Sequence, residues 1–285
     1  MTFQNPNTDI YVPHGGPFDE AFAKTTHMAI AAHQDDIEIM AYDGILACLE
    51  KPGMSFSGVV VTDGRGSARK GPYQSFSDDL MEETRRLEQR KAADIGHYGA
   101  MVQLGYPSKA VKDPEDASIV SDLVSLLEKA RPDVLYTHNL ADKHDTHIGV
   151  TMKTINALRT LPKDIRPKAL YGCEVWRDLD WMNDEDKIVF DVSGRPDLAK
   201  KLVDVFDSQI AGGKRYDTAT IGRRLAHATY HTSHQTDASD ALIFAMDLTP
   251  LIVDDTLDIL AYVTAHIDRF RDDVGTKIGK HMFSH

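Results

Sequence analysis

The sequence predicts a Rossmann-like α/β fold, a three-layer sandwich with a mostly parallel central sheet and helices on both faces. Two observations lead to this prediction. Short apolar runs typical of buried strands alternate along the chain with longer segments of helical periodicity. Strands joined by helical crossovers lie parallel, and right-handed crossovers place helices on both faces of the sheet. The length of 285 residues is enough for one large domain of this kind.

The individual elements follow from apolar runs, caps and breakers. A buried strand is predicted over residues 28–32, and further strands over 56–62, 101–104, 134–137 and 187–192. Helices are predicted over 37–49, from an N-cap at Ser77 to a stop at Gly96, and over 119–130, 147–158, 198–206 and 251–270.

No linker composition divides the chain, so residues 1–285 are predicted to form one domain. Residues 1–24 are rich in proline, glycine and polar side chains and indicate an arm packed on the surface. The α/β core is predicted over 26–192. Residues 193–285 form a less regular extension, which could serve as a substrate lid or as the subunit contact of a homo-oligomer.

Composition excludes several classes of function. The net charge is −12, which is unfavourable for binding nucleic acid or an anionic membrane surface. No apolar run approaches the roughly 20 residues that span a bilayer, and the N-terminus lacks the features of a secretory signal. The two cysteines are far apart and indicate neither a disulfide framework nor a metal knuckle. We therefore expect a cytoplasmic protein that acts on a small molecule.

Two polar clusters follow predicted strands at the places where α/β sheets bind ligands. The first is His33-Gln34-Asp35-Asp36-Ile37-Glu38, and the second runs from His138 to His147. If both strands are central, the clusters face each other across one crevice. Imidazole and carboxylate together suit Zn²⁺, and three protein ligands with an open position are typical of a catalytic site.

The spacing within each cluster is compatible with metal binding. His33 and Asp36 are three residues apart at a strand-to-helix turn, and His144 and His147 have similar spacing. The remaining carboxylate, Asp35, could then serve as a base, and the remaining imidazole as an acid or oxyanion partner. The alternative is that the two aspartates cap the next helix and the histidines belong to a surface loop. The occurrence of both clusters after separate strands favours the metal site.

The residues Ala32-His33-Gln34-Asp35-Asp36-Ile37-Glu38 resemble the Ala-His-Pro-Asp-Asp-x-Glu signature of the PIG-L/LmbE-like de-N-acetylases. The second family motif, Asp-x-His-Pro-Asp-His, is matched by residues 142–147. The resemblance extends to Thr62-Asp63-Gly64, to Arg85-x-x-Glu88 and to Ser208-Gln209. It covers roughly residues 26–210.

The resemblance implies a Zn²⁺-dependent hydrolase, with Fe²⁺ as an alternative metal, that cleaves an N-acetyl amide, chiefly of N-acetylglucosamine-type compounds. It implies His33, Asp36 and His147 as metal ligands, Asp35 as general base and His144 as the group that stabilises the oxyanion. The chain departs from the family at Gln34, where the family has proline, and at Asp145-Thr146, where it has Pro-Asp. The family aspartate tunes the neighbouring histidine. Asp145 or Asp142 is the candidate replacement.

Substrate-binding residues are predicted from the polar segments near the clusters. Arg65 and Arg69 follow a strand end and could bind a phosphate or carboxylate, or could belong to a solvated basic loop. Asp142 and Lys214 are further candidates, and the His- and Arg-rich segment 208–240 could form a lid or a subunit contact. The competing functions are hydrolysis of a non-sugar amide or a phosphoester, and metal binding without catalysis.

Overall fold

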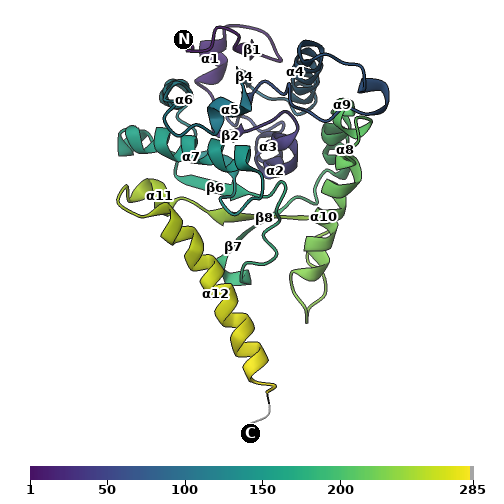
Figure 1. Cartoon of the computed structure of the whole chain (residues 1–285), viewed down its shortest axis with the longest axis vertical. Coiled ribbons are helices and arrows are strands. Elements are labelled where there is room, and N and C mark those ends of the chain that lie inside the picture. The colour runs from purple at the N-terminus through teal and green to yellow at the C-terminus, as the bar shows by residue number, and fades with distance from the viewer. Residues whose placement is uncertain (283–285) are drawn as a thin grey trace.

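A single eight-stranded sheet runs through the computed structural model, which describes residues 1–282 (Figure 1). Its strands are β1 Asp9–Tyr11, β2 His27–Ala31, β3 Phe56–Thr62, β4 Ala100–Tyr106, β5 Val134–His138, β6 Ala169–Cys173, β7 Lys187–Asp191 and β8 Leu242–Asp247. They lie in the order β1-β4-β3-β2-β5-β6-β8-β7.

The five central strands are parallel, and antiparallel strands complete the sheet at both edges. β2 pairs in parallel with both β3 and β5, and the parallel set extends to β4 on one side and β6 on the other. β1 is antiparallel to β4, while β8 is antiparallel to β6 and β7. Because the chain proceeds outward in opposite directions from β2 and from β5, the switch point of the topology lies between these two strands. In such sheets the carboxyl ends at the switch point flank the ligand crevice.

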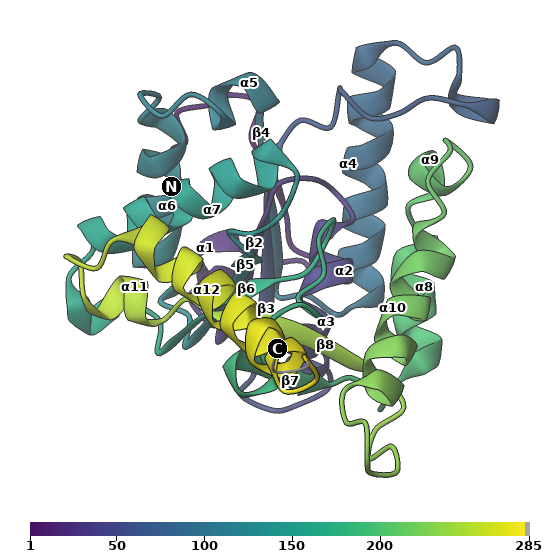
Figure 2. The ribbon, with the colours of Figure 1, turned by 60° about the horizontal axis from the view of Figure 1, so that its bottom comes forward.

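Helices cover both faces of the sheet, which confirms the predicted three-layer α/β fold (Figure 2). Helices α6, α7 and α12 lie on one side, and α4, α8 and α10 lie on the other. The helices of three or more turns are α4 Asp78–Ile95, α6 Ser118–Ala130, α7 Asp145–Thr160, α10 Tyr216–Tyr230 and α12 Ile259–Gly279. The shorter ones are α1 Phe18–Phe22, α2 Asp36–Met40, α3 Tyr42–Cys48, α5 Ser108–Val111, α8 Pro196–Asp204, α9 Asp207–Ile210 and α11 Pro250–Val253.

The cap predicted at Ser77 is present and begins the helix that supports the site. The Ser77 side chain accepts a hydrogen bond from the Leu80 amide at 3.2 Å, and acidic residues occupy the first turn of α4. Both features stabilise a helix N-terminus. The helix stops at Gly96, as predicted.

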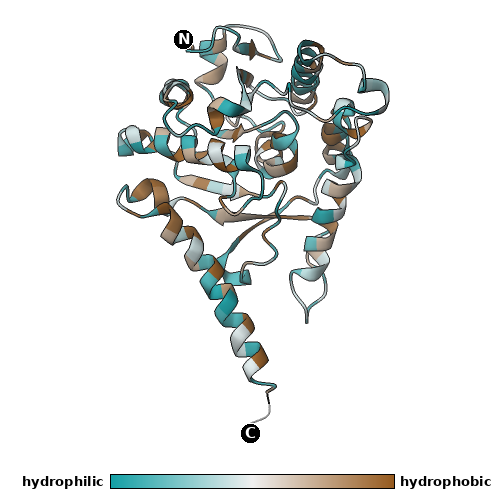
Figure 3. Cartoon of the chain, viewed as in Figure 1, coloured by the Kyte–Doolittle hydropathy of each residue, from teal (hydrophilic) through white to brown (hydrophobic). Residues whose placement is uncertain are grey.

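Figure 3 shows brown apolar residues gathered toward the interior of the molecule and teal polar residues over the outer surface.

Two predicted helices are each divided in two. The segment 37–49 forms α2 and α3, with a break at Ala41 that allows every residue from Asp36 to Tyr42 to be buried. An unbroken helix would turn one side of this segment away from the core. The segment 251–270 was predicted as one helix but contains α11 and then α12, which starts at a new cap where Asp258 accepts from the Ala261 amide at 2.7 Å.

Three strands were not predicted from the sequence. They are β1, β6 and β8, of which β1 has three residues and β6 contains a glycine, so neither shows clear strand periodicity. The predicted surface arm supplies β1, and the predicted C-terminal extension supplies β8, which inserts between β6 and β7. The sheet therefore includes residues from all three predicted regions. Within residues 1–282, no helix combines the length and apolar character needed to cross a membrane.

Candidate active site

The loop between β2 and α2 carries the first polar cluster. The Asp36 carboxylate accepts a hydrogen bond from the His33 amide at 2.7 Å, and the same oxygen, Oδ2, lies 3.2 Å from His33 Nδ1. Asp35 has a φ of +95°, in the left-handed region that side chains rarely adopt, and it is buried. Backbone strain of this kind persists only where the surrounding structure enforces it.

The loop between β5 and α7 carries the second cluster. His147 is fully buried on the first turn of α7, and its Nδ1 lies 3.2 Å from Asp142 Oδ2. The other oxygen of Asp142 accepts from the amides of Lys143 and His144, at 2.6 and 3.2 Å. A carboxylate on one imidazole nitrogen fixes the tautomer and directs the lone pair of the other nitrogen outward.

The two loops meet around one point. His147 Nε2 lies 3.2 Å from His33 Nδ1 and 3.4 Å from Asp36 Oδ2, and the latter two atoms are 3.2 Å apart. We call His33, Asp36 and His147 the trio. Because His147 Nδ1 donates to Asp142, its Nε2 presents a lone pair to another nitrogen and to a carboxylate oxygen. Such a convergence of acceptors is stable only with a cation or a proton between them. The donor set of two imidazoles and one carboxylate fits Zn²⁺ or a similar divalent ion.

His138 is a second histidine close to Asp36, and sequence reasoning assigned it no role. It is fully buried at the end of β5, and its Nε2 lies 3.6 Å from Asp36 Oδ2. That nitrogen accepts a hydrogen bond from the Ala32 amide at 2.9 Å, so its lone pair is already used. Its ring stacks on that of His147 at 3.9 Å. His138 therefore packs behind the trio and joins the ends of the two central strands.

Asp35 lies beside the trio and is held from helix α4. Arg85 forms an ion pair with its Oδ2 at 3.3 Å and also donates to the Gln34 carbonyl. The Asp35 amide donates to Gln89 at 3.3 Å. Burial raises the pKa of Asp35 to about 7, against the opposing charge of Arg85. A carboxyl with a pKa near neutrality is suited to accept and return a proton.

A buried carboxyl continues this network behind Asp35. Glu38 accepts from the Gln89 side chain at 2.8 Å and from the Tyr98 hydroxyl at 2.7 Å. Burial raises the pKa of Glu38 to about 8. Gln89 thus connects the backbone of Asp35 to a buried polar group in the core, and this contact supports the left-handed backbone at Asp35. Neither Arg85 nor Gln89 was assigned to the site from the sequence, although Arg85 belongs to one of the matched family motifs.

His144 lies on the other side of the trio, with its ring centroid 5.1 Å from that of His33. Burial lowers the pKa of His144 to about 4, so the imidazole is neutral near pH 7. Its buried Nδ1 has no hydrogen-bond partner among the described residues. Of the two predicted replacements for the family aspartate, Asp142 contacts His147 and Asp145 is exposed. The side chain of His144 therefore lacks the carboxylate support that the family motif provides.

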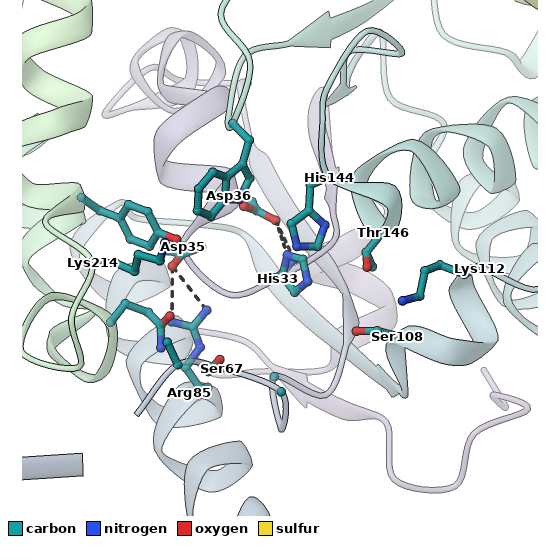
Figure 4. A pocket seen from close by; sticks show the side chains of 16 residues that line it. His33, Asp35, Asp36, Ser67, Arg85, Ser108, Lys112, His144, Thr146 and Lys214 are labelled. Atoms are coloured by element: carbon teal, nitrogen blue, oxygen red, sulfur yellow. Dashed lines mark hydrogen bonds and ion pairs between the residues drawn. The ribbon is translucent and has the colours of Figure 1, made fainter. Parts of the chain in front are cut away.

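An open cavity of about 450 Å³ adjoins these residues (Figure 4). It is lined by His33, Asp35, Asp36, Gly64, Gly66, Ser67, Ala68, Arg85, Ser108, Lys112, His144, Thr146, Trp176, Gln209, Lys214 and Tyr216. His33 and Asp36 of the trio, together with Asp35, thus have access to a space large enough for a small substrate.

Of the four residues predicted to bind substrate, one lines the cavity and three do not. Lys214 lines the cavity, with its ammonium group 4.6 Å from the centre of the Trp176 ring. Arg65 and Arg69 are not among the lining residues, because their guanidinium groups pair with carboxylates on the first turns of α4. Asp142 lies behind His147 and does not line the cavity.

The segment 208–240 contributes one wall of the cavity through its first residues. Ser208 donates from its amide and its hydroxyl to Glu88 on α4, at 2.7 and 2.6 Å. This contact joins two of the matched family motifs and positions the next residue, Gln209, at the cavity. The later residues of the segment form α10, which packs against α8 and β8.

Comparison with known proteins agrees with this geometry. Residues 28–158, which include both loops, match the protein family described as PIG-L: GlcNAc-PI de-N-acetylase. No curated protein matches the chain.

Three solved structures share the fold. N,N'-diacetylchitobiose deacetylase from Pyrococcus horikoshii is 18% identical with a TM-score of 0.63, over 81% of this chain and 86% of that one. GalB, the 4-carboxy-2-hydroxymuconate hydratase from Pseudomonas putida KT2440, is 15% identical with a TM-score of 0.60, over 79% and 95%. The A40926 pseudoaglycone deacetylase Dbv21 is 17% identical with a TM-score of 0.55, over 79% and 97%. The part of the chain that carries both loops is therefore similar to the PIG-L family, and the chain shares the fold of these solved structures.

Proposed function

We propose that this protein is a metal-dependent hydrolase that removes an acyl group, chiefly acetyl, from the nitrogen of an amino sugar derivative. The observation that carries the proposal is the position of Asp35, a carboxyl with a pKa of about 7, on the cavity wall beside His33 and Asp36, which His147 contacts from behind. The family match and the two deacetylases of the same fold support the choice of an N-acetyl amide. The fold alone does not select this reaction, since a hydratase shares it.

The residues have separate parts in the proposed reaction. His33, Asp36 and His147 would hold the metal, and Asp142 orients His147. When bound, a divalent ion such as Zn²⁺ supplies Lewis acidity, which activates water and polarises the acyl carbonyl. Asp35 accepts the proton of the attacking water at its carboxylate. His144 is neutral and donates a hydrogen bond to the oxygen that gains negative charge. The proton on Asp35 then passes to the leaving nitrogen, which yields the free amine and the carboxylic acid.

Replacement of the base tests the proposal. We expect Asp35→Asn to lower kcat by about 10²- to 10⁴-fold, the usual contribution of general acid–base catalysis. Its zinc content, measured by metal analysis, should match that of the wild type because Asp35 is outside the trio. Asp94→Asn is the matched control, since Asp94 is exposed and, within residues 1–282, its side chain hydrogen-bonds only to Tyr11. Normal amine release by Asp35→Asn would show that the base is assigned wrongly.

A substrate panel separates the proposal from its competitors. The zinc-loaded protein is assayed for amine release from acetylated amino sugars and from N-acetylated amino acids, and for phosphate release from an aryl phosphate. We expect amine release from the sugars to be the fastest. Phosphate release without amine release would favour a phosphoesterase. The absence of any turnover by a protein with one tightly bound zinc would favour a metal-binding protein without catalysis.

A further inference from the structure

Three polar side chains form a wall of the cavity on the side of α5 and α7. Lys112, Ser108 and Thr146 all line the cavity, and Figure 4 shows the Lys112 ammonium group pointing between the two hydroxyl groups. Thr146 is only 2% exposed, and no hydrogen bond among residues 1–282 involves its hydroxyl group. The Ser108 hydroxyl and the Lys112 ammonium group likewise form no hydrogen bond or ion pair in the described part of the chain. We call these three residues the Lys112 wall.

The Lys112 wall differs from the other charged parts of the cavity lining. Arg85 pairs with Asp35, and Lys214 lies over the ring of Trp176, whereas Lys112 has no such partner among the described residues. The only lining carboxylates are Asp35 and Asp36, and both belong to the reaction centre. A substrate that fills the cavity therefore meets uncompensated positive charge on this side, although the chain as a whole carries a net charge of −12.

The backbone that carries the wall is fixed by packing and hydrogen bonds, although the Lys112 side chain itself is exposed. α5 packs so closely on α7 that a Cβ added at Gly149 would lie only 2.9 Å from the Val111 carbonyl oxygen. The turn after Lys112 is held by Lys153, whose ammonium group is buried and donates to the carbonyls of Asp113 and Asp116 at 2.6 and 2.5 Å. Preorganised donors bind an anion with a smaller loss of side-chain entropy than mobile ones.

Thr146 occupies the position where the matched family motif has aspartate. A carboxylate there would compensate the charge of Lys112 and repel an anionic ligand. Threonine instead provides a neutral hydroxyl donor. Because Asp142 supports His147, the trio does not need a carboxylate at position 146.

We infer that the Lys112 wall is an anion subsite and that the substrate is an N-acylated compound bearing a phosphate or carboxylate group. Lys112 supplies the charge, and the hydroxyl groups of Ser108 and Thr146 donate hydrogen bonds to the anionic oxygens. This inference rests on the proposed function, because the anion is placed relative to an amide at the reaction centre.

The test compares matched neutral and anionic substrates. The zinc-loaded protein is assayed with N-acetylglucosamine, its 6-phosphate and N-acetylmuramate, so that phosphate and carboxylate are distinguished. We expect kcat/KM to be at least about tenfold higher for one of the anionic compounds, as one charge-assisted contact supports. Lys112→Ala should remove most of this preference and change the neutral reaction little. Thr146→Asp should also remove most of the preference. Thr146→Val, which keeps the shape without the hydroxyl, should reduce it less than Thr146→Asp.

Lys109→Ala is the matched control, because Lys109 is exposed on the same helix and does not line the cavity. An equal kcat/KM for neutral and anionic substrates, unchanged in Lys112→Ala, would overturn the subsite while leaving the proposed function standing.

Binding is measured separately by calorimetry, with the zinc-loaded Asp35→Asn variant and N-acetylglucosamine 6-phosphate or N-acetylmuramate. Binding that depends on Lys112, with no amine release by the wild type, would support the subsite and contradict the hydrolase. Binding of neither anionic compound would overturn the subsite.

Discussion

The two loops that form the site are held in place in different ways. The β2–α2 loop depends on a helix that begins some 40 residues later, because Arg85 and Gln89 of α4 hold Asp35 and its backbone. The β5–α7 loop is held from within by Asp142 at His147, by Thr151 on the following helix, and by backbone groups of the segment 173–177, which bond Asn139 and Asp142. The first loop carries the strained residue and the proposed base, whereas the second carries no left-handed residue. The strained backbone is therefore the one supported by side chains of a separate helix.

The largest expected effect concerns the contacts that α4 makes with the β2–α2 loop. Arg85→Met should lower the free energy of unfolding by about 3 kcal/mol or more, because it leaves the buried Asp35 carboxyl and the Gln34 carbonyl without their partner. Urea denaturation measures the change. Arg86→Met is the control. Its ion pair with Glu83 is half-exposed and should contribute at most about 1 kcal/mol. Equal losses in the two variants would show that the β2–α2 loop does not depend on α4.

The contact between Asp142 and His147 within the β5–α7 loop is tested by measuring zinc affinity. Asp142→Ala should weaken zinc binding by about 10- to 100-fold, because His147 loses the carboxylate that orients its ring. A competition titration with a chelator measures the affinity. Asp145→Ala provides the comparison, since Asp145 is exposed and its side chain forms no hydrogen bond or ion pair in the described chain. The zinc affinity of Asp145→Ala should be unchanged. A similar loss of affinity in both variants would show that Asp142 has no special part in supporting His147.

The smallest effect concerns the link between β5 and α7. The Thr151 hydroxyl donates to the His138 carbonyl at 2.8 Å, so Thr151→Val should cost about 1 kcal/mol of unfolding free energy. Thr154→Val removes a hydroxyl that bonds only within its own helix, at Val150. Thermal denaturation should show a smaller loss for Thr154→Val. The reverse order would mean that the second loop is not held through Thr151.

Much of the parallel sheet could be predicted from the sequence, and the resemblance to a known family implied the three residues of the trio. The four central strands 28–32, 56–62, 101–104 and 134–137 correspond to β2, β3, β4 and β5 within a few residues. Their apolar runs are local signals, and the carboxyl ends of parallel strands meet at one edge whatever the loops do. The structure accordingly places His33, Asp36 and His147 within contact of one another.

Other parts of the site depend on contacts that leave no local pattern. Arg65 and Arg69 follow a strand end as expected, but carboxylates of α4 pair with them and keep them out of the cavity lining. Lys112, which follows the four-residue helix α5, is placed at the cavity by the packing of α5 on α7. β8 was missed because its place between β6 and β7 is set by antiparallel pairing with strands distant in sequence.

The sequence by itself determined the order of the parallel elements and the two motifs at their ends, since periodicity and residue spacing are properties of short segments. Only the tertiary structure decided which aspartate supports which histidine, which cations remain without carboxylate partners and which segment closes the cavity. These outcomes depend on side-chain distances between elements that are far apart along the chain. A difference of a few ångströms there separates an ion pair from a free charge.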